Sequence, residues 1–434
     1  MELDAVVLCS ALSRVKIAGL SAGERALRVV RRAGATRTFV IEGDAAEPRA
    51  GLVAWRAGRT CPVLVVRADQ LVHTPLVAPL IAAPSDGVAI AVGPDDGYAG
   101  ALLARGSAAD QVIAALGRGD SDAALAATAP VRVRHGEIAR HAIATAEERR
   151  AAQRMLFRIL IKPQDNAITR YLYRPVSLPL TRLLVWTPIT PNQVSCVVAA
   201  LVAIGCWLTA QASPRAAIAG TVVVLVASYV DCCDGEIARV KLLSSRWGAW
   251  LDTIVDELSS IGYMVALGWH CHQVFGRAGF ERFTGAPLAF DPWLWATAIG
   301  VATYSWSVYC IYYNIIVAVG SANSQDYAGR FEVVPGRDPR SVRLRPVVAP
   351  PSTPARPRPR GLALIATYAP YLVRRDFISW FAVVLAIAHW THVLFALFFA
   401  GGVVTSVIVT IDHARLRRLR RAILRSGKRL EPPD

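Results

Sequence analysis

The chain has 434 residues, of which 54% are hydrophobic, and a formal net charge of +16 at pH 7. This length allows two or three domains. A basic balance can indicate nucleic-acid binding, but here the Lys and Arg residues lie in loops beside apolar stretches, as the positive-inside rule describes, so we expect no nucleic-acid partner. None of the eight Cys residues forms a C-x-x-C pair, which argues against both a disulfide framework and a zinc site.

The N-terminal region, residues 1–140, alternates short apolar runs with segments of helical composition. The expected strands are Val6–Cys9, Thr38–Ile41, Pro62–Val66 and Val88–Val92, and the expected helices are Glu24–Arg32 and Ala109–Leu116. This alternation predicts a small α/β domain of βαβ units with buried parallel strands. The N-terminus has no signal-peptide pattern, so we expect this half to stay on the cytosolic side of a membrane.

A connecting region follows over residues 141–191. Residues 141–160 are rich in Arg, Glu and Ala and predict a helix. Residues 161–191 carry Lys162, Arg170, Arg174 and Arg182 among Leu, Tyr and Trp side chains. We expect this second part to be an amphipathic helix that lies in the membrane interface with its basic side toward lipid headgroups.

The C-terminal half contains apolar segments of the length that crosses a bilayer, about 20 residues. We expect six spans, at residues 193–211, 216–234, 247–269, 293–319, 376–390 and 392–412. They form an all-α transmembrane domain over residues 192–413, followed by a basic tail over residues 414–434. The fifth span is short.

Loop charges predict the orientation of these spans. Lys and Arg concentrate in the connections between spans 2 and 3 and between spans 4 and 5, and in the tail. By the positive-inside rule, both termini of this integral membrane protein face the cytosol, at the inner membrane if the source is bacterial. Residues 346–360 hold six Pro and three Arg, which favours a disordered linker; a Pro-rich partner-binding motif is the alternative.

Four carboxylates stand out at the junction of spans 2 and 3. Asp231 and Asp234 are three residues apart at the end of span 2, and Asp252 and Asp256 are four apart at the start of span 3. Each pair therefore shares one helix face. Four charges at the bilayer centre would cost about 10–14 kcal/mol. We therefore expect them to converge in a polar cavity near the cytosolic interface, where such oxygen donors suit Mg²⁺ or Mn²⁺, with room for two ions.

Two other interpretations of these carboxylates stay open. A structural ion-pair cluster is disfavoured because the regularly spaced positions of this pattern hold four Asp residues and one Arg, Arg239. An ion or proton relay would make the protein an ion-coupled transporter. Gly235 and Gly248 flank the acidic pairs, and their missing Cβ atoms allow a ligand to approach the backbone closely. Arg239 can pair with a phosphate or a carboxylate.

The whole pattern, D-x2-D-G-x2-A-R-x8-G-x3-D-x3-D, resembles the signature of the CDP-alcohol phosphotransferases at every fixed position from Asp231 to Asp256. Thr190-Pro191-Asn192 is similar to the Pro-Asn pair with which that family begins its first helix. The likeness covers about residues 160–420. It implies an integral-membrane enzyme in which an acceptor hydroxyl attacks the β-phosphorus of a CDP-alcohol and CMP is released. A homodimer is also implied.

The resemblance implies a role for each matching residue. The metal ligands would be Asp231, Asp234, Asp252 and Asp256, and Asp256 would also be the general base. The nucleotide pocket would comprise Asp231, Gly235, Ala238, Arg239, Gly248 and Asn192. The donor would be CDP-diacylglycerol or a CDP-inositol type of alcohol, in the synthesis of a phospholipid or a polyol phosphate. A catalytically inactive membrane scaffold is the remaining alternative.

A second polar cluster precedes span 5, where Arg374 and Arg375 stand before Asp376. It is either a positive-inside anchor or an anion site for the phosphate of an acceptor or a lipid headgroup. Lys162 and Arg174 are further candidates for such an anion site.

The N-terminal region is similar to nucleotidyltransferase domains of sugar- and inositol-phosphate cytidylyltransferases, around residues 16–34 and at residues 62–66 with Asp69. Proteins that fuse such a domain to a di-inositol-phosphate phosphate synthase have the same arrangement, which suggests inositol phosphate as a substrate. Those domains cradle a triphosphate in a Gly-rich loop, whereas residues 8–14 here contain no Gly. The domain is therefore either active, through Lys16 and Asp69, or a degenerate regulatory or assembly domain.

Overall fold

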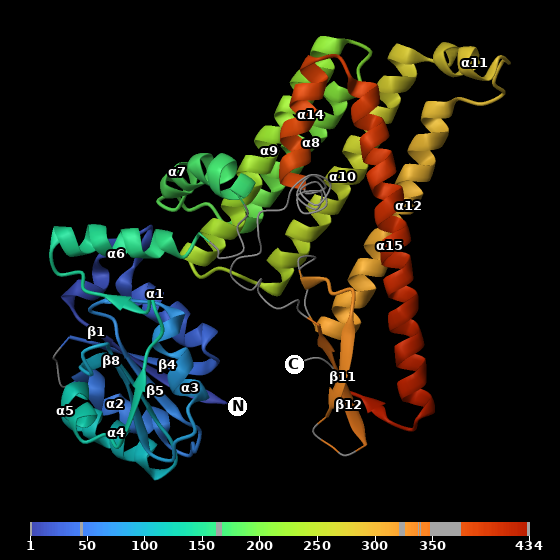
Figure 1. The fold of residues 1–434 in the computed structure, drawn as a ribbon. Coiled ribbons are helices and arrows are strands. Elements are labelled where there is room, and N and C mark those ends of the chain that lie inside the picture. The colour runs from blue at the N-terminus through green and yellow to red at the C-terminus, as the bar shows by residue number, and fades with distance from the viewer. Residues whose placement is uncertain are drawn as a thin grey trace, which may run out of the picture. The chain divides into compact units, whose positions relative to one another are not determined.

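A computed structural model describes residues 2–43, 47–161, 167–320, 326–336, 338, 340–347 and 375–431 (Figure 1). The chain divides into two compact units. The first unit comprises Met1–Asp165, Leu178–Ile189 and Gly235–Leu243. The second comprises Asn166–Ser177, Thr190–Asp234 and Ser244–Asp434. Each unit is described by itself below.

The first unit is built on a six-stranded sheet with the order β4-β1-β5-β8-β7-β9. The strands are β1 (Leu3–Cys9), β4 (Ala35–Glu42), β5 (Val63–Arg67), β7 (Val88–Val92), β8 (Tyr98–Ala104) and β9 (Val131–Arg134). The buried strands are rich in Val and Leu, whose side chains pack well on a pleated surface. Two small antiparallel pairs accompany the sheet: β2 (Lys16–Ile17) with β3 (Leu20–Ser21), and β6 (Leu71–Val72) with β10 (Arg140–His141).

Helices cover both faces of this sheet. Because side chains alternate along a strand, Ala5 and Val7 of β1 pack into one core with α1 (Ala22–Arg32) and α3 (Ala78–Ala82). Val6 packs into the other core. The helices of that second core are α2 (Glu47–Arg56), α4 (Ser107–Arg118) and α5 (Asp122–Ala127). The helix expected in residues 141–160 is present as α6 (Ala146–Arg158), capped by Thr145 and Glu148.

The four expected strands correspond to β1, β4, β5 and β7 and run in the same direction, but the sheet also contains β8, which was not expected. β1 is parallel to both β4 and β5, as expected, but β8 is antiparallel to β5 and to β7. The sheet is therefore mixed. β8 has the sequence YAGALLA, whose Ala and Gly residues have low strand propensity, and the strand was missed for that reason.

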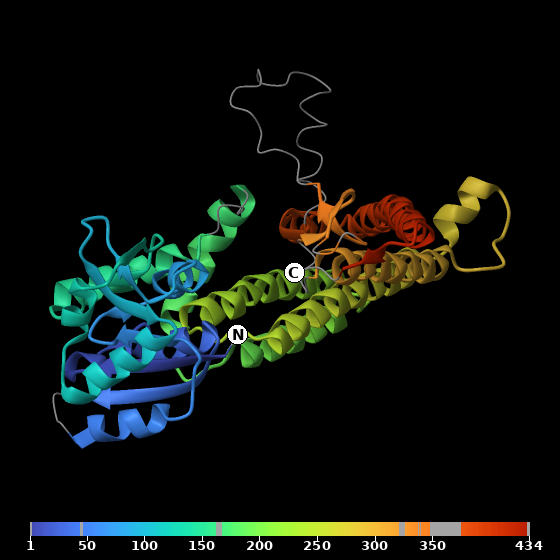
Figure 2. The same ribbon diagram turned by 90° about the horizontal axis from the view of Figure 1, so that it is seen from below.

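The second unit is helical, and Figure 2 shows its long helices running side by side. They are α8 (Pro191–Thr209), α9 (Pro214–Val240), α10 (Arg246–Phe275), α12 (Pro292–Asn314), α14 (Arg375–Ile387) and α15 (Thr391–Arg425). Of α9, the part up to Asp234 belongs to this unit. Side-chain caps fix several starting points: Thr190 and Gln193 form a capping box for α8, and Ser245 and Asp291 cap α10 and α12.

Each expected span coincides with one of these helices. Among the described residues, α8, α9 and α15 are long and apolar enough to cross a membrane. α10 carries Asp252, Asp256 and Glu257 within its first half, α12 is rich in Trp and Tyr, and α14 has only 13 residues. A bundle of six spans therefore stays a prediction.

The segment expected to lie in the interface forms η3 (Thr169–Tyr173), a π-helical turn, followed by α7 (Arg174–Leu184). Beyond α12 the chain forms η4 (Ile315–Val319), then β11 (Phe331–Pro335) and β12 (Ser341–Pro346). α15 extends past the expected end of the last span, and β13 (Arg429–Leu430) in the basic tail pairs with β12. The short helix α11 (Ala278–Thr284) precedes α12. Residues 348–360 of the Pro-rich loop lie outside the described residues.

Two glycines allow α8 and α9 to pack closely. A Cβ atom on Gly220 would lie 2.5 Å from the carbonyl oxygen of Gly205, which is too short for any real contact. Small residues at such contacts let helix backbones approach in membrane proteins. Gly220→Ala should therefore destabilise the bundle by about 1–3 kcal/mol, because the backbones must separate.

Thermal unfolding in detergent measures this effect. Gly401→Ala on α15 is the matched control, because an added Cβ there meets no atom within 4 Å. Alanine favours a helix over glycine by about 1 kcal/mol, so the control should be neutral or slightly stabilising. Equal melting temperatures for the two variants would show that α8 and α9 are not in close contact at Gly220.

Candidate active site

Three of the four expected carboxylates converge in the second unit. Asp231 on α9 and Asp252 and Asp256 on α10 each offer an oxygen atom, and these atoms lie within 4.8 Å of one another. All three residues are half-buried. The expected spacing explains the convergence, since Asp252 and Asp256 are four residues apart on one face of α10.

The chemistry of this group fits a hard divalent cation. Carboxylate oxygens are the preferred ligands of Mg²⁺ and Mn²⁺. At this separation, like charges repel by about 3 kcal/mol per pair at an effective dielectric constant near 20, and a cation reverses the sign of that energy. Asp231, Asp252 and Asp256 are therefore the residues that would hold a metal ion.

The fourth carboxylate, Asp234, has a different environment. It is buried, and its Oδ2 accepts a hydrogen bond of 2.7 Å from Ser195 Oγ. Ser195 is itself buried on α8, and the carbonyl oxygen of Pro191 lies 3.3 Å from the same hydroxyl as an alternative acceptor. The hydroxyl of Ser195 therefore helps to fix the orientation of the Asp234 carboxylate.

The expected nucleotide residues differ in the space beside their backbone. A Cβ atom on Gly235 would meet no atom within 4 Å, so space adjoins α9 one residue after Asp234. A Cβ atom on Gly248 would lie 3.1 Å from Asn192 Oδ1, which places the Asn192 side chain against the first turns of α10. Ala238 and Arg239 are half-buried on the last turn of α9.

Comparison with known proteins decides the family of this region. Residues 188–398 match the sequence model of a family described as CDP-alcohol phosphatidyltransferase. These residues form a CDP-alcohol phosphatidyltransferase domain. The resemblance drawn from the Asp231–Asp256 motif is confirmed.

The chain is also similar to curated proteins named "Bifunctional IPC transferase and DIPP synthase". The Aquifex aeolicus protein is 30% identical over 164 residues, 38% of this chain and 34% of that protein. The Rubrobacter xylanophilus protein is 33% identical over 36% of each chain. The Thermococcus kodakarensis protein is 33% identical over 33% of this chain and 35% of its own length. The match thus spans about a third of the length of these relatives.

The structure describes the remaining residues of the expected phosphate site only in part. Arg174 is buried at the start of α7. Arg375 is the first residue of α14, and its side chain is outside what the structure describes, as are Lys162 and Arg374 as a whole. An anion site built from these residues therefore stays a prediction.

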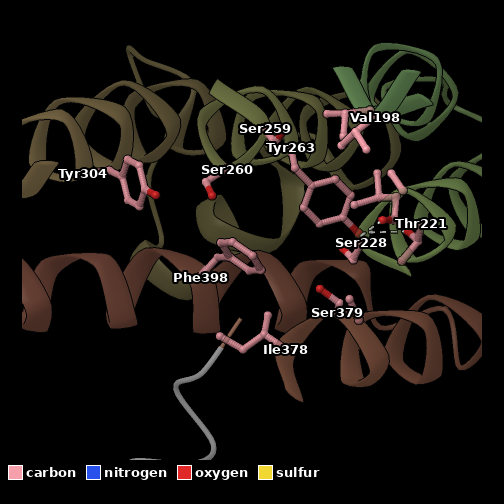
Figure 3. Close-up of a pocket in the computed structure, with 14 residues that line it drawn as sticks. Val198, Thr221, Ser228, Ser259, Ser260, Tyr263, Tyr304, Ile378, Ser379 and Phe398 are labelled. Atoms are coloured by element: carbon pink, nitrogen blue, oxygen red, sulfur yellow. Dashed lines mark hydrogen bonds between the residues drawn. The ribbon is translucent and has the colours of Figure 1, made fainter. Parts of the chain in front are cut away.

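A cavity of about 250 Å³ opens within the CDP-alcohol phosphatidyltransferase domain (Figure 3). Its walls are mainly apolar, and residues of α8, α9, α10, α12, α14 and α15 line it. Ser228 lies one helical turn before Asp231, and Ser259 one turn after Asp256, so the cavity adjoins the carboxylate helices. The hydroxyls of Ser228 and Ser259 donate to carbonyl oxygens of their own helices, which leaves the cavity suited to an apolar group.

Two polar contacts of this domain were missed in the sequence. Ser195 could have been found, because it lies three residues after Asn192 and so on the same face of α8. Glu257 accepts hydrogen bonds from Tyr304 Oη at 2.7 Å and Tyr312 Oη at 3.2 Å. Both tyrosines are on α12, and no local pattern signals that contact.

The expected nucleotidyltransferase site of the first unit has an internally bonded loop. Residues Ala11–Arg14 form a 3₁₀ helix after β1, closed by a reciprocal capping box between Ser10 and Ser13. The backbone N–H groups of Ser10 and Leu12 donate to serine hydroxyls, and Ser13 Oγ donates to the carbonyl oxygen of Ala68. Those N–H groups are used within the loop and are not directed at a triphosphate.

Lys16 and Asp69 are the other candidates there, and their role stays a prediction. Lys16 is exposed on β2. The carboxylate of Asp69 is paired with the Arg67 guanidinium, and this hydrogen bond raises the pKa of Arg67. A metal ion at Asp69 would compete with Arg67 for the carboxylate.

Proposed function

We propose that this chain is an integral-membrane CDP-alcohol phosphotransferase. It would transfer the alcohol-phosphate group of a CDP-alcohol to an acceptor hydroxyl and release CMP. The observation that carries the proposal is the convergence of Asp231, Asp252 and Asp256 to within 4.8 Å inside a CDP-alcohol phosphatidyltransferase domain.

In the proposed mechanism, the carboxylate of Asp256 accepts the proton of the acceptor hydroxyl. The hydroxyl oxygen then forms a bond to the β-phosphorus, and the bond between that phosphorus and the bridging oxygen breaks, so that CMP leaves with the oxygen. The open backbone at Gly235 admits the nucleotide, and the Arg239 guanidinium neutralises phosphate charge. Ser195 holds Asp234 in place.

A divalent cation, Mg²⁺ or Mn²⁺, would be held by Asp231, Asp252 and Asp256, with Asp234 as ligand of a second ion. When bound, such ions stabilise the charge that develops on the phosphoryl and leaving-group oxygens. Together with the apolar helices, this supports a reaction at a membrane surface. The loop charges favour the cytosolic face, with both termini on the same side, and the family likeness favours a homodimer.

Two classes of CDP-alcohol donor fit the proposed reaction. The relatives' names, IPC transferase and DIPP synthase, favour a polyol-phosphate donor of the CDP-inositol type with an inositol phosphate acceptor. The apolar cavity beside the carboxylate helices favours a lipid donor such as CDP-diacylglycerol. A CMP-release assay on purified protein that crosses both donors with inositol phosphate, inositol, glycerol phosphate and serine tests the proposal. Flux of ions into vesicles without CMP release would instead favour a transporter. Failure to bind either a divalent metal or a CDP-alcohol donor would favour a catalytically inactive scaffold.

The cavity supplies a sharper test of the donor. Val202→Phe adds bulk to the α8 wall of the cavity. If an acyl chain occupies the cavity, the KM for CDP-diacylglycerol should rise about tenfold, or roughly 1.4 kcal/mol. The KM for a CDP-polyol should not change.

Val197→Phe is the matched control, because Val197 is an exposed residue of the same helix. It should leave both KM values unchanged. An unchanged KM for CDP-diacylglycerol in Val202→Phe would place the acyl chain outside the cavity.

We also infer that the first unit is not an active cytidylyltransferase. The internally bonded loop after β1 and the Arg67–Asp69 pair support this. Formation of CDP-alcohol from CTP by the purified chain would contradict it.

A further inference from the structure

The C-terminal end of α9, which carries the nucleotide residues of the motif, is bonded to α1. Arg25 Nη1 donates to the carbonyl oxygen of Val240 at 2.8 Å, and Arg28 Nη1 donates to that of Lys241 at 2.6 Å. All these residues belong to the first unit. The last carbonyl groups of a helix lack partners within the helix, and cations there are favoured by the helix dipole.

Leu242 joins the same segment to the core of the first unit. Its backbone is in the left-handed region, with φ at +55°, which is uncommon for a bulky residue. Its side chain is 8% exposed and packs in the core formed by β1, β5 and α1. Such a conformation persists only where the surroundings enforce it, so the side-chain anchor outweighs the backbone strain.

Burial of the Arg25 side chain costs folding free energy in the first unit. This side chain is fully buried, and its Nε and Nη2 atoms have no hydrogen-bond partner among the residues that the structure describes. Burial, with a smaller contribution from Arg28, lowers the pKa of the guanidinium to about 10. An apolar residue at this position would cost less folding free energy than a buried guanidinium does. We therefore attribute the presence of Arg25 to its hydrogen bond with the carbonyl oxygen of Val240.

The opposite side of the segment is held as well. Lys241 Nζ donates to the carbonyl oxygens of Thr187 at 2.6 Å and Ile189 at 3.0 Å. Within the motif, the buried carboxylate of Glu236 accepts a hydrogen bond of 2.6 Å from Thr181 Oγ1 on α7. The segment of residues 235–243 is therefore held by hydrogen bonds to α1 on one side and to residues 181–189 on the other. Gly235, Ala238 and Arg239 keep the positions that the helix α9 gives them.

We propose that Arg25 and Arg28 are positioning residues of the transferase, through which α1 fixes the nucleotide-binding segment Gly235–Arg239. This inference rests on the proposed function. It gives the first unit a role in donor binding that needs no catalytic site of its own. Loss of the two bonds should loosen the end of α9 and weaken binding of the CDP-alcohol, leaving the carboxylates and their chemistry in place.

The test uses the full chain with Arg25→Met and Arg28→Met combined. We expect the KM for the CDP-alcohol to rise about tenfold, kcat to change less than threefold, and amide hydrogen exchange to quicken over residues 235–243. Arg25→Lys, which keeps a donor, should restore part of the lost affinity. Arg31→Met is the matched control, since Arg31 is an exposed residue of the same helix, and it should behave as the wild type.

A role in folding alone would give a different result. It would lower the melting temperature and the fraction of active protein, with an unchanged KM, and that outcome would overturn the proposal. So would unchanged exchange over residues 235–243. Hydrogen exchange needs no substrate, so if the wild type releases no CMP from any donor, the proposed function fails while the positioning role is still decided by this measurement.

Discussion

Asp256→Asn is expected to lower the rate of CMP release by about 10³-fold or more. General-base catalysis contributes roughly 10²–10⁴-fold, and the same substitution weakens the metal group by removing one of three negative charges. Asn keeps the size and one oxygen of the side chain, so α10 and its contacts should be unaffected. Initial rates at saturating donor and metal measure the effect.

Glu257→Gln is the matched control for this substitution. Glu257 is the next residue of α10, and its carboxylate faces Tyr304 and Tyr312. Gln retains an acceptor for these tyrosines, so the rate should stay within about threefold of the wild type. If Asp256→Asn were as active as Glu257→Gln, Asp256 could not be the base, and the role would have to move to another carboxylate of the cluster.

The parts of this site that could be predicted are those set by local spacing. The i, i+3 and i, i+4 separations of the four Asp residues place each pair on one face of a helix, and a short basic connection brings the two helices together. Three carboxylates do converge, and the matched family agrees with the motif. The strands β1, β4, β5 and β7 were found because short continuous apolar runs, broken by Gly, Asp and Arg, are a local signal.

The parts that could not be predicted depend on contacts distant in sequence. The antiparallel placement of β8 follows from pairing, and its Ala-rich sequence hides it. Ser195 meets Asp234 across 39 residues, and Arg25 meets Val240 across 215. No window of sequence contains both partners of such a bond. Leu242 illustrates the same limit, since a left-handed Leu is explained only by the core that its side chain enters.

The second large effect concerns metal. Removal of divalent cations with a chelator should abolish CMP release, and Mg²⁺ or Mn²⁺ should restore it, because the three carboxylates supply a hard oxygen donor set within 4.8 Å. A ligand that binds only the folded state stabilises it by about 2.7 kcal/mol at 100 times its Kd. Added metal should therefore raise the melting temperature of the protein in detergent as well as its activity.

Asp252→Asn separates this metal effect from general stabilisation by salt. In the chelated protein it should raise the melting temperature, because it removes two of the three repulsions among Asp231, Asp252 and Asp256, each about 3 kcal/mol before solvent screening. It should also abolish most of the shift caused by metal, whereas Glu257→Gln should keep that shift. The opposite pattern, a chelated protein that Asp252→Asn destabilises and a metal shift that survives, would mean that the cluster is held together by protein contacts and binds no cation there.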